Sequence, residues 1–250
     1  MGGSEFSRSF DRVAEIYDAT RGLPGEVMER LMETLSAELN GCTEILDIGV
    51  GTGRLAEPLQ DAGFEVVGID ISRKMAGKAR EKGVKQLLLA DASFLPFKPE
   101  AFDAAICVHV LHLISEWRKV LQEICRVSRS AMFSLSNTPR NPVREAYRRL
   151  LRRYGYEGHR PGMSEQQLED LSLSAKSLFV SSYDVHADGS LTSLEQQASS
   201  SQWEIPEDVN LKIVEELKTR FVGKVFKQEL FLLVWDINSL KAYVDNLQRC

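Results

Sequence analysis

The strongest constraint on this chain is a glycine-rich segment that follows a short apolar run and precedes a helical pattern. It reads Leu46-Asp47-Ile48-Gly49-Val50-Gly51-Thr52-Gly53. Glycines in such a turn permit positive φ angles and let the backbone approach a ligand where a Cβ atom would clash. A glycine turn between a strand and a helix is typical of nucleotide-binding α/β folds. The segment therefore predicts a ligand site at the end of the first strand, with a tight turn that binds nothing as the simpler alternative.

Apolar runs and amphipathic patterns alternate from about residue 42 to 136. Nearly continuous apolar strands joined by helices predict a mostly parallel sheet covered on both faces, in an α/β, Rossmann-like, doubly wound arrangement. The expected strands are 44–48, 64–69, 86–90, 102–108, 131–135, 178–183 and 228–235. The expected helices are 54–62, 72–82, 116–127, 142–154, 164–173, 207–220 and 238–248.

The alternating pattern divides the chain into four segments. We expect residues 1–40 to form N-terminal helices over the site and residues 41–137 to form the ligand-binding core. Residues 138–205 break the alternation and are predicted to be a cap insertion that covers the substrate. Residues 206–250 are predicted to complete the core as helix, strand and helix.

Composition narrows the class of protein. The formal net charge is −5, which gives no general reason to expect a nucleic acid or an anionic membrane as partner. We see no apolar run near the roughly 20 residues that a spanning helix needs, so we expect no membrane span. The cysteines at 42, 107, 125 and 250 form no C-x-x-C pair, and no metal-ligand cluster is visible. Reduced, mostly buried thiols indicate a cytoplasmic protein, which we expect to be a monomer or a homodimer.

The spacing of the glycines separates two kinds of cofactor. A dinucleotide fold has the pattern G-x-G-x-x-G, whereas here the spacing is G-x-G-x-G and Arg54 follows. Asp47 stands directly before the glycines, and a carboxylate there is poorly suited to a pyrophosphate. It suits a ligand that carries an ammonium and a sulfonium group. These features oppose the alternative of a dinucleotide oxidoreductase.

Two further carboxylates follow the second and third strands. Asp70 is placed to accept hydrogen bonds from ribose hydroxyls, although capping of the next helix is a competing role that Ser72 fills better. Ile71 is placed to lie against a purine face. Asp91 can accept from an adenine amino group while the backbone of Ala92 donates to the ring. Acidic residues at the ends of three successive strands therefore predict an adenosyl ligand.

The chain resembles the class I S-adenosylmethionine-dependent methyltransferases, in the broad type 11 family that includes the ubiquinone and menaquinone C-methyltransferases. The resemblance covers roughly residues 10–137. It is carried by Phe10-Asp11, Ala14, Tyr17-Asp18, Arg21, Ile45–Gly53, Asp70–Met75, Asp91–Phe97, Phe102-Asp103, Val110-Leu111-His112 and Glu123–Val127. It implies a seven-stranded fold and S-adenosyl-L-methionine as cofactor. The chain departs from the family at His112-Leu113, where the family often has two histidines, and at Ser128-Arg129-Ser130, where it often has Pro-Gly-Gly.

The resemblance also implies roles for individual residues. Asp47 and the glycines would hold the methionine part of the cofactor, Asp70 the ribose, and Asp91 with Ala92 the adenine. Tyr17 and Arg21 would close over the cofactor, with Arg21 as a partner for its carboxylate. The complete set of expected cofactor-binding residues is Tyr17, Arg21, Asp47, Gly49, Gly51, Gly53, Asp70, Ile71, Met75, Asp91, Ala92 and Val108.

The acceptor side carries weaker signals. A sulfonium donor needs an aligned nucleophile and sometimes a general base, for which His109 and His112 are candidates; a structural role is the alternative for each. We expect a small-molecule methyl acceptor and no metal. The arginine-rich helix 140–153 leaves open an RNA or protein methyltransferase, but a solvated helix face is the simpler explanation. A methyltransferase-like module that binds the cofactor without turnover is a further alternative.

Overall fold

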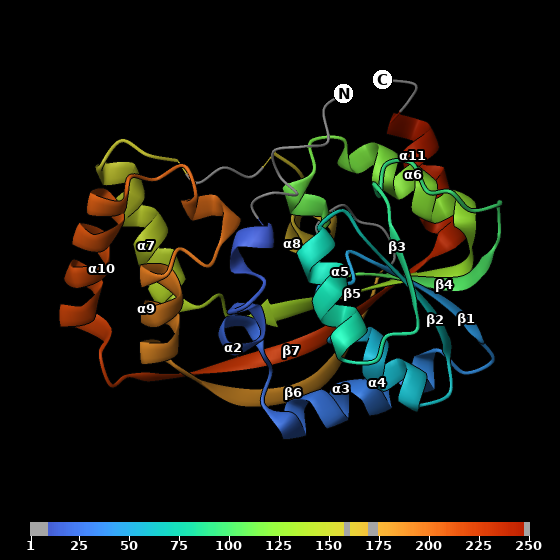
Figure 1. Cartoon of the computed structure of the whole chain (residues 1–250), viewed down its shortest axis with the longest axis horizontal. Helices are drawn as coiled ribbons and strands as arrows, with labels where there is room; N and C mark the ends of the chain where they lie inside the picture. Colours follow the sequence, from blue (N-terminus) through green and yellow to red (C-terminus); the bar gives the residue numbers. More distant parts are fainter. Residues whose placement is uncertain (1–9, 158–160, 170–174, 248–250) are drawn as a thin grey trace.

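The computed structural model describes residues 10–157, 161–169 and 175–247, and all structural statements concern these residues. A seven-stranded sheet runs through the molecule in the order β3-β2-β1-β4-β5-β7-β6 (Figure 1). Its strands are β1 (Glu44–Ile48), β2 (Glu65–Asp70), β3 (Gln86–Leu89), β4 (Phe102–Cys107), β5 (Ser128–Thr138), β6 (Lys176–His186) and β7 (Val225–Asp236).

The first five strands are parallel, and β7 runs antiparallel to both β5 and β6. Apolar residues on both faces explain the central position of β1, where Ile45, Leu46 and Ile48 are fully buried. The predicted α/β, doubly wound and mostly parallel fold is confirmed. The last three strands are longer than expected. Their hydrogen-bonded ladders continue beyond the apolar runs, pairing β5 with β7 from Ala131 to Thr138.

Helices cover both faces of the sheet. One face packs against α3 (Gly25–Glu38), α4 (Ala56–Asp61) and α5 (Arg73–Glu81), which share a core cluster with β1 and β2. The other face packs against α6 (Trp117–Val127) and α11 (Ile237–Leu247), with α8 (Glu165–Glu169) beside them. Both layers are visible in Figure 1, where α3 and α4 lie below the sheet and α6 and α11 above it. The remaining part of the predicted helix 164–173 lies outside the described residues.

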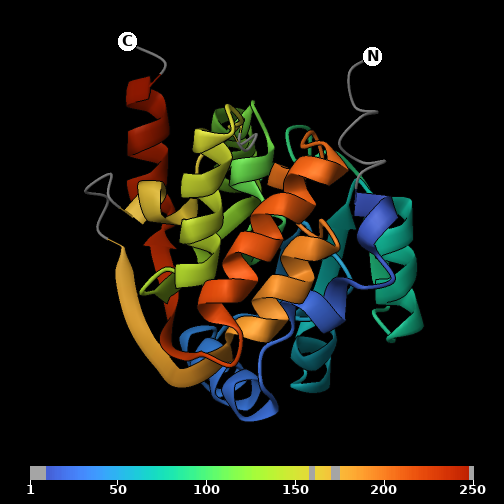
Figure 2. The ribbon, with the colours of Figure 1, turned by 90° about the vertical axis from the view of Figure 1, so that its left-hand side faces the viewer.

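Three helices form a separate layer beyond one end of the sheet, which we call the helical layer. They are α7 (Pro142–Arg153), α9 (Ala187–Glu195) and α10 (Glu207–Phe221), and they share their own apolar core. Figure 2 shows them side by side in front of the sheet. Residues 138–205 supply β6 to the sheet and α7 and α9 to the helical layer. Residues 206–250 supply β7 to the sheet and α10 to the helical layer.

Two short 3-10 turns and a short N-terminal helix complete the described chain. They are η1 (Leu111–Leu113), η2 (Ser200–Gln202) and α2 (Tyr17–Arg21). No helix in the described part of the chain is both long and apolar enough to cross a bilayer.

Candidate functional site

A cavity of about 570 Å³ lies at the carboxyl ends of the parallel strands, and we call it the sheet cavity. The strand order reverses between β1 and β4, and open α/β sheets bind their ligands at such a switch point. The volume falls within the range of small-molecule sites. The lining residues are Phe10, Tyr17, Gly49, Gly51, Ile69, Asp70, Ile71, Met75, Ala90, Asp91, Ala92, Ser93, Val108, His109, Val110, Leu113, Ile114, Ser115, Glu116 and Pro161.

The glycine turn forms one wall of the sheet cavity. Gly49 and Gly51 have φ angles of 69° and 57°, in the left-handed region that other residues rarely adopt. A Cβ atom on Gly49 would collide with the side chain of Val110. Gly53 does not line the cavity. Its absent Cβ leaves room for Ala79 and for Val84, whose Cγ2 would lie 2.6 Å away, so Gly53 lets the turn pack against α5.

Asp70 joins the end of β2 to the glycine turn. Its Oδ2 accepts the backbone N–H of Gly51 at 2.9 Å, and its Oδ1 accepts that of Ser72 at 2.7 Å. Burial raises the pKa of Asp70 above its ordinary value, although the two backbone hydrogen bonds oppose this effect. Ser72, which is fully buried, caps α5 by accepting from the N–H of Met75. Asp70 therefore faces the cavity and does not act as the side-chain cap of the helix.

The next wall lies between the ends of β2 and β3. Ile71 is 42% exposed, unusual for its apolar side chain, and Met75 packs behind it at 2%. Asp91 and Ala92 follow β3 and line the same cavity. Asp91 accepts the backbone N–H of Ser93 at 2.8 Å, which fixes the turn. An exposed apolar side chain between two carboxylates matches the pattern expected for a purine nucleoside.

Asp47 lies behind the glycine turn and is not among the residues that line the sheet cavity. Its side chain is only 4% exposed. Burial, and then the charge of Asp70, raises the pKa of Asp47 to about 7, against a smaller opposite effect of Arg54. The sequence placed Asp47 at the cavity because it is adjacent to the glycines, but adjacency along the chain does not set side-chain direction.

The N-terminal segment, defined here as residues 10–21, closes one side of the sheet cavity. Phe10 and Tyr17 line the cavity directly. Phe10 also packs edge-on against Trp203, with ring centroids 5.1 Å apart. Asp11 accepts from the N–H of Lys74 at 3.0 Å and from the hydroxyl of Ser72, so it attaches the segment to the start of α5.

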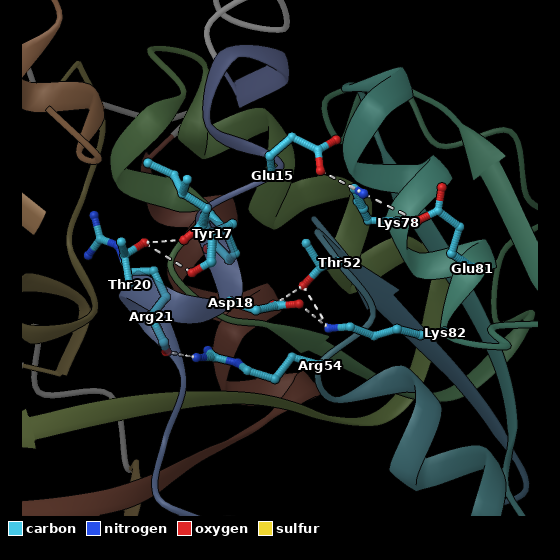
Figure 3. A network of polar contacts seen from close by, with 11 residues as sticks. Glu15, Tyr17, Asp18, Thr20, Arg21, Thr52, Arg54, Lys78, Glu81 and Lys82 are labelled. Atoms are coloured by element: carbon cyan, nitrogen blue, oxygen red, sulfur yellow. Dashed lines mark hydrogen bonds and ion pairs between the residues drawn. The ribbon is translucent and has the colours of Figure 1, made fainter. Parts of the chain in front are cut away.

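A polar network attaches α2 to the glycine turn (Figure 3). Asp18 accepts from the Thr52 hydroxyl at 2.5 Å and pairs with Lys82 at 2.5 Å. Burial raises the pKa of Asp18, but the hydrogen bonds from Lys82 and Thr52 together hold it below its ordinary value. A second pair joins Glu15 to Lys78 at 2.8 Å. Sequence reasoning did not assign these residues, because their partners lie in distant parts of the chain.

Arg21 does not lie where we expected a partner for the carboxylate of the cofactor. It does not line the sheet cavity, and its guanidinium donates to the carbonyl of Ala198 at 3.4 Å. Its own carbonyl accepts from Arg54 (Figure 3). Arg21 therefore connects the N-terminal segment to residues 196–203, which we call the bridging loop.

The two candidate histidines occupy different positions. His109 lines the sheet cavity after β4 and has a φ angle of 58°, an uncommon value for a non-glycine residue. His112 belongs to η1 and is not among the lining residues. Their rings are 6.4 Å apart between centroids. Of the two, His109 has access to a molecule in the cavity.

Several lining residues were not identified from sequence. Leu113, Ile114, Ser115 and Glu116 extend the wall beyond β4. Their position just after the fourth strand was the available signal, since loops at this edge of the sheet form the site. Pro161 reaches the cavity because the N–H of the next residue, Gly162, donates to the carbonyl of His112 at 3.3 Å.

The cavity fits S-adenosylmethionine on geometric grounds. It combines a glycine turn that a Cβ would obstruct, a partly buried carboxylate at the end of β2 and an exposed apolar side chain beside it. Fold and site together define a class I, Rossmann-like methyltransferase architecture.

Comparison with known proteins agrees with this class. Residues 46–135 match the model of a methyltransferase domain, and the chain is similar to class I S-adenosylmethionine-dependent methyltransferases. A demethylmenaquinone methyltransferase of Renibacterium salmoninarum is 32% identical over 158 residues, which cover 60% of this chain and 66% of the relative. The chain spans 47–66% of the length of this and two other curated relatives that it matches.

Solved structures share the fold at low sequence identity. Magnesium protoporphyrin IX methyltransferase of Synechocystis PCC 6803, solved with S-adenosylhomocysteine bound, has a TM-score of 0.52 and 20% identity, and 92% of this chain and 94% of that one are covered. The cyclase SpnF has a TM-score of 0.55 and 19% identity, with coverage of 92% and 96%. These similarities establish the fold. S-adenosylmethionine is the cofactor of the family.

Proposed function

We propose that this chain transfers a methyl group from S-adenosylmethionine to a small organic acceptor bound in the sheet cavity. The observation that carries the proposal is the position of Asp70, which holds the glycine turn through Gly51 and faces a cavity that also contains Ile71 and Asp91. When bound, the cofactor supplies a methyl group made electrophilic by its sulfonium.

In this proposal, different residues of the chain bind different parts of the cofactor. Asp70 accepts hydrogen bonds from the ribose, and Ile71 lies against the purine. Asp91 and the backbone of Ala92 recognise the adenine edge. Gly49 and Gly51 let the backbone approach the methionine part, beside Val108 and Met75, which line the same cavity. Asp47 does not contact the cofactor directly in this proposal, because its side chain is buried behind the turn.

The acceptor side is the wall that follows β4. His109 is the candidate proton acceptor, since it lines the cavity and an imidazole nitrogen can take a proton from a bound acceptor. His112 is a positioning residue for the same wall, because its carbonyl accepts from Gly162. Leu113 and Ile114 provide apolar contact for an organic acceptor.

The N-terminal segment excludes water from the sheet cavity in this proposal. Phe10 and Tyr17 cover the cavity, and Asp11 and Asp18 fasten the segment to α5 and the glycine turn. A closed site favours transfer to the acceptor over reaction with water, because it holds the reacting groups in alignment.

A cofactor-binding module without methyl transfer is the second candidate. The cyclase SpnF shares this fold, so the fold alone does not require a methyl acceptor. The position of His109 in the cavity favours turnover. Methylation of RNA or protein is not favoured, because the cavity wall described above is that of a small-molecule site.

The test has two arms. Thermal stability is measured with S-adenosylmethionine, S-adenosylhomocysteine and NAD, since a ligand that binds only the native state raises the melting temperature. We expect the first two to stabilise the chain and NAD to have no effect; stabilisation by NAD alone contradicts the proposal. Candidate acceptors are then screened for transfer of an isotopically labelled methyl group. Cofactor binding with no transfer to any acceptor class favours the binding module.

For His109, the matched pair is His109→Gln and His112→Gln. We expect His109→Gln to lower kcat and to change its pH profile, because the proton acceptor is removed, with cofactor affinity unchanged. His112→Gln should leave the profile in place. Equal effects of the two variants would remove the distinction drawn between them.

A further inference from the structure

A second cavity, of about 320 Å³, opens in the helical layer, and we call it the arginine pocket. It shares no lining residue with the sheet cavity. Its walls come from α7, the end of α9 and the bridging loop. The lining residues are Arg140, Arg144, Tyr147, Arg148, Leu151, Arg152, Tyr156, Glu157, Leu194, Ser199 and Ser201.

The arginines reach the pocket because of their helical spacing. Arg144, Arg148 and Arg152 are four residues apart on α7 and share one side of it. The apolar side of the same helix, which includes Leu150, is buried in the core of the helical layer. The simpler expectation for these arginines was a solvated face, whereas the structure places them around a concavity.

Positive charge dominates the pocket. Among the residues that the structure describes, four guanidinium groups and one carboxylate, that of Glu157, line the pocket, which gives an excess of three positive charges. Like charges gathered in a concave site repel one another and raise the local potential, so a bound anion relieves that repulsion. The planar guanidinium fork matches phosphate and carboxylate oxygens.

A buried hydrogen-bond network forms the floor of the pocket. The hydroxyl of Tyr147 donates to Oδ1 of Asn210, a fully buried residue of α10. Nδ2 of Asn210 donates to the carbonyl of Leu194 at 3.0 Å, and Gln202 donates to that carbonyl at 2.8 Å. This buried network joins α7, α9, α10 and η2.

Two further contacts order the walls. The guanidinium of Arg144 donates to the hydroxyl of Ser193 at 3.1 Å. The hydroxyls of Ser199 and Ser201 lie 3.4 Å apart on the bridging loop. Polar groups held in place before binding reduce the entropy that a ligand must lose, so the pocket is preorganised for an anion.

We infer that the arginine pocket binds the phosphate or carboxylate group of a small organic anion. A volume of 320 Å³ lies at the lower end of the range for small-molecule sites, enough for an oxyanion with a short organic part. A macromolecular polyanion fits less well. The charge is gathered in a concavity, and the whole chain carries a net charge of −5.

The test compares two double variants with the same loss of charge. Arg148→Gln with Arg152→Gln removes guanidiniums that line the pocket. Arg149→Gln with Arg153→Gln removes neighbours on the same helix that do not line it. Binding of inorganic phosphate and of citrate is measured by calorimetry at fixed ionic strength, and circular dichroism checks that each variant folds.

We expect the pocket variant to bind both anions at least tenfold more weakly and the control variant to bind them as the unmodified chain does. Equal weakening in the two variants would overturn the inference, as would absence of anion binding by the unmodified chain. Binding of a single-stranded oligonucleotide or of phosphatidylserine vesicles without binding of phosphate or citrate would also overturn it.

A kinetic arm separates two sources of the anion. If the anionic group belongs to the methyl acceptor, phosphate inhibits transfer competitively against the acceptor. If it belongs to a separate effector, phosphate changes kcat without that competition. The calorimetric arm does not depend on the proposed methyl transfer, so the two proposals fail independently.

Discussion

The carboxylate of Asp70 holds the backbone N–H of Gly51 at 2.9 Å, so the residue expected to bind the ribose also fixes the glycine turn. The glycine turn and the expected ribose site therefore depend on the same side chain, that of Asp70. Replacing Asp70 removes a hydrogen-bond acceptor from the cavity and loosens the turn that forms the adjacent wall.

We predict that Asp70→Ala weakens S-adenosylhomocysteine binding by about tenfold to a hundredfold, the range for loss of hydrogen bonds to a charged group. Calorimetry measures the affinity. Asp208→Ala, an exposed carboxylate on α10, is the control and should bind normally. Unchanged affinity in Asp70→Ala would refute the ribose assignment.

The raised pKa of Asp47 predicts that the free energy of unfolding depends on pH. Its pKa is raised to about 7 in the folded chain by burial and by Asp70. The pKa of Asp47 is therefore higher in the folded chain than in the unfolded chain, where it is near 4. Below pH 4 this difference costs no stability, and folding stability is lost as the pH rises through about 7. Asp47→Asn removes this loss, because the amide stays neutral.

The free energy of unfolding of Asp47→Asn, relative to the unmodified chain, should therefore increase between pH 4 and pH 8, by at most about 4 kcal/mol. Urea denaturation at several pH values measures it. Parallel curves for the two proteins would show that folding does not raise the pKa of the Asp47 carboxyl group.

Two glycines offer opposite predictions. Gly49→Ala places a Cβ against Val110 in a residue with positive φ, so it should destabilise the chain and abolish cofactor binding. Gly77→Ala lies in α5 with no atom within 4 Å of the new Cβ, so it should stabilise the chain by about 0.5–1 kcal/mol. Thermal unfolding and binding assays check both. A destabilised Gly77→Ala would contradict the assigned helix.

Asp18→Asn tests the closure of the sheet cavity. The ion pair with Lys82 is partly exposed and contributes at most about 1 kcal/mol, so the cofactor-free chain should unfold almost normally. Dissociation of bound S-adenosylhomocysteine should become faster, because α2 loses its ion pair with Lys82 beside the glycine turn. Stopped-flow fluorescence measures the rate, and Asp208→Asn, in an exposed pair on α10, is the control.

The local features of the sheet were predictable because strand and helix signals are contained in short stretches. The expected strand 44–48 coincides with β1, and the glycine turn lies at its end as predicted. α9 was missed, because Asp188, Gly189 and Ser190 are weak helix formers and the helix is stabilised by the core of the helical layer.

Side-chain direction was harder to predict than position along the chain. Asp70, Asp91 and Val108 line the sheet cavity, whereas Asp47, Gly53, Arg21 and His112 do not. These four lie within a few residues of lining residues along the chain, but Asp47 is buried behind the glycine turn, Gly53 packs against α5 and Arg21 contacts the bridging loop. Contacts between distant segments decide this, and no local pattern encodes them.

The N-terminal segment contacts three different parts of the molecule. It touches α5 through Asp11, the glycine turn through Asp18 and the bridging loop through Arg21. The bridging loop in turn supplies Ser199 and Ser201 to the arginine pocket. The segment that closes one side of the sheet cavity thus also contacts the loop that forms a wall of the arginine pocket.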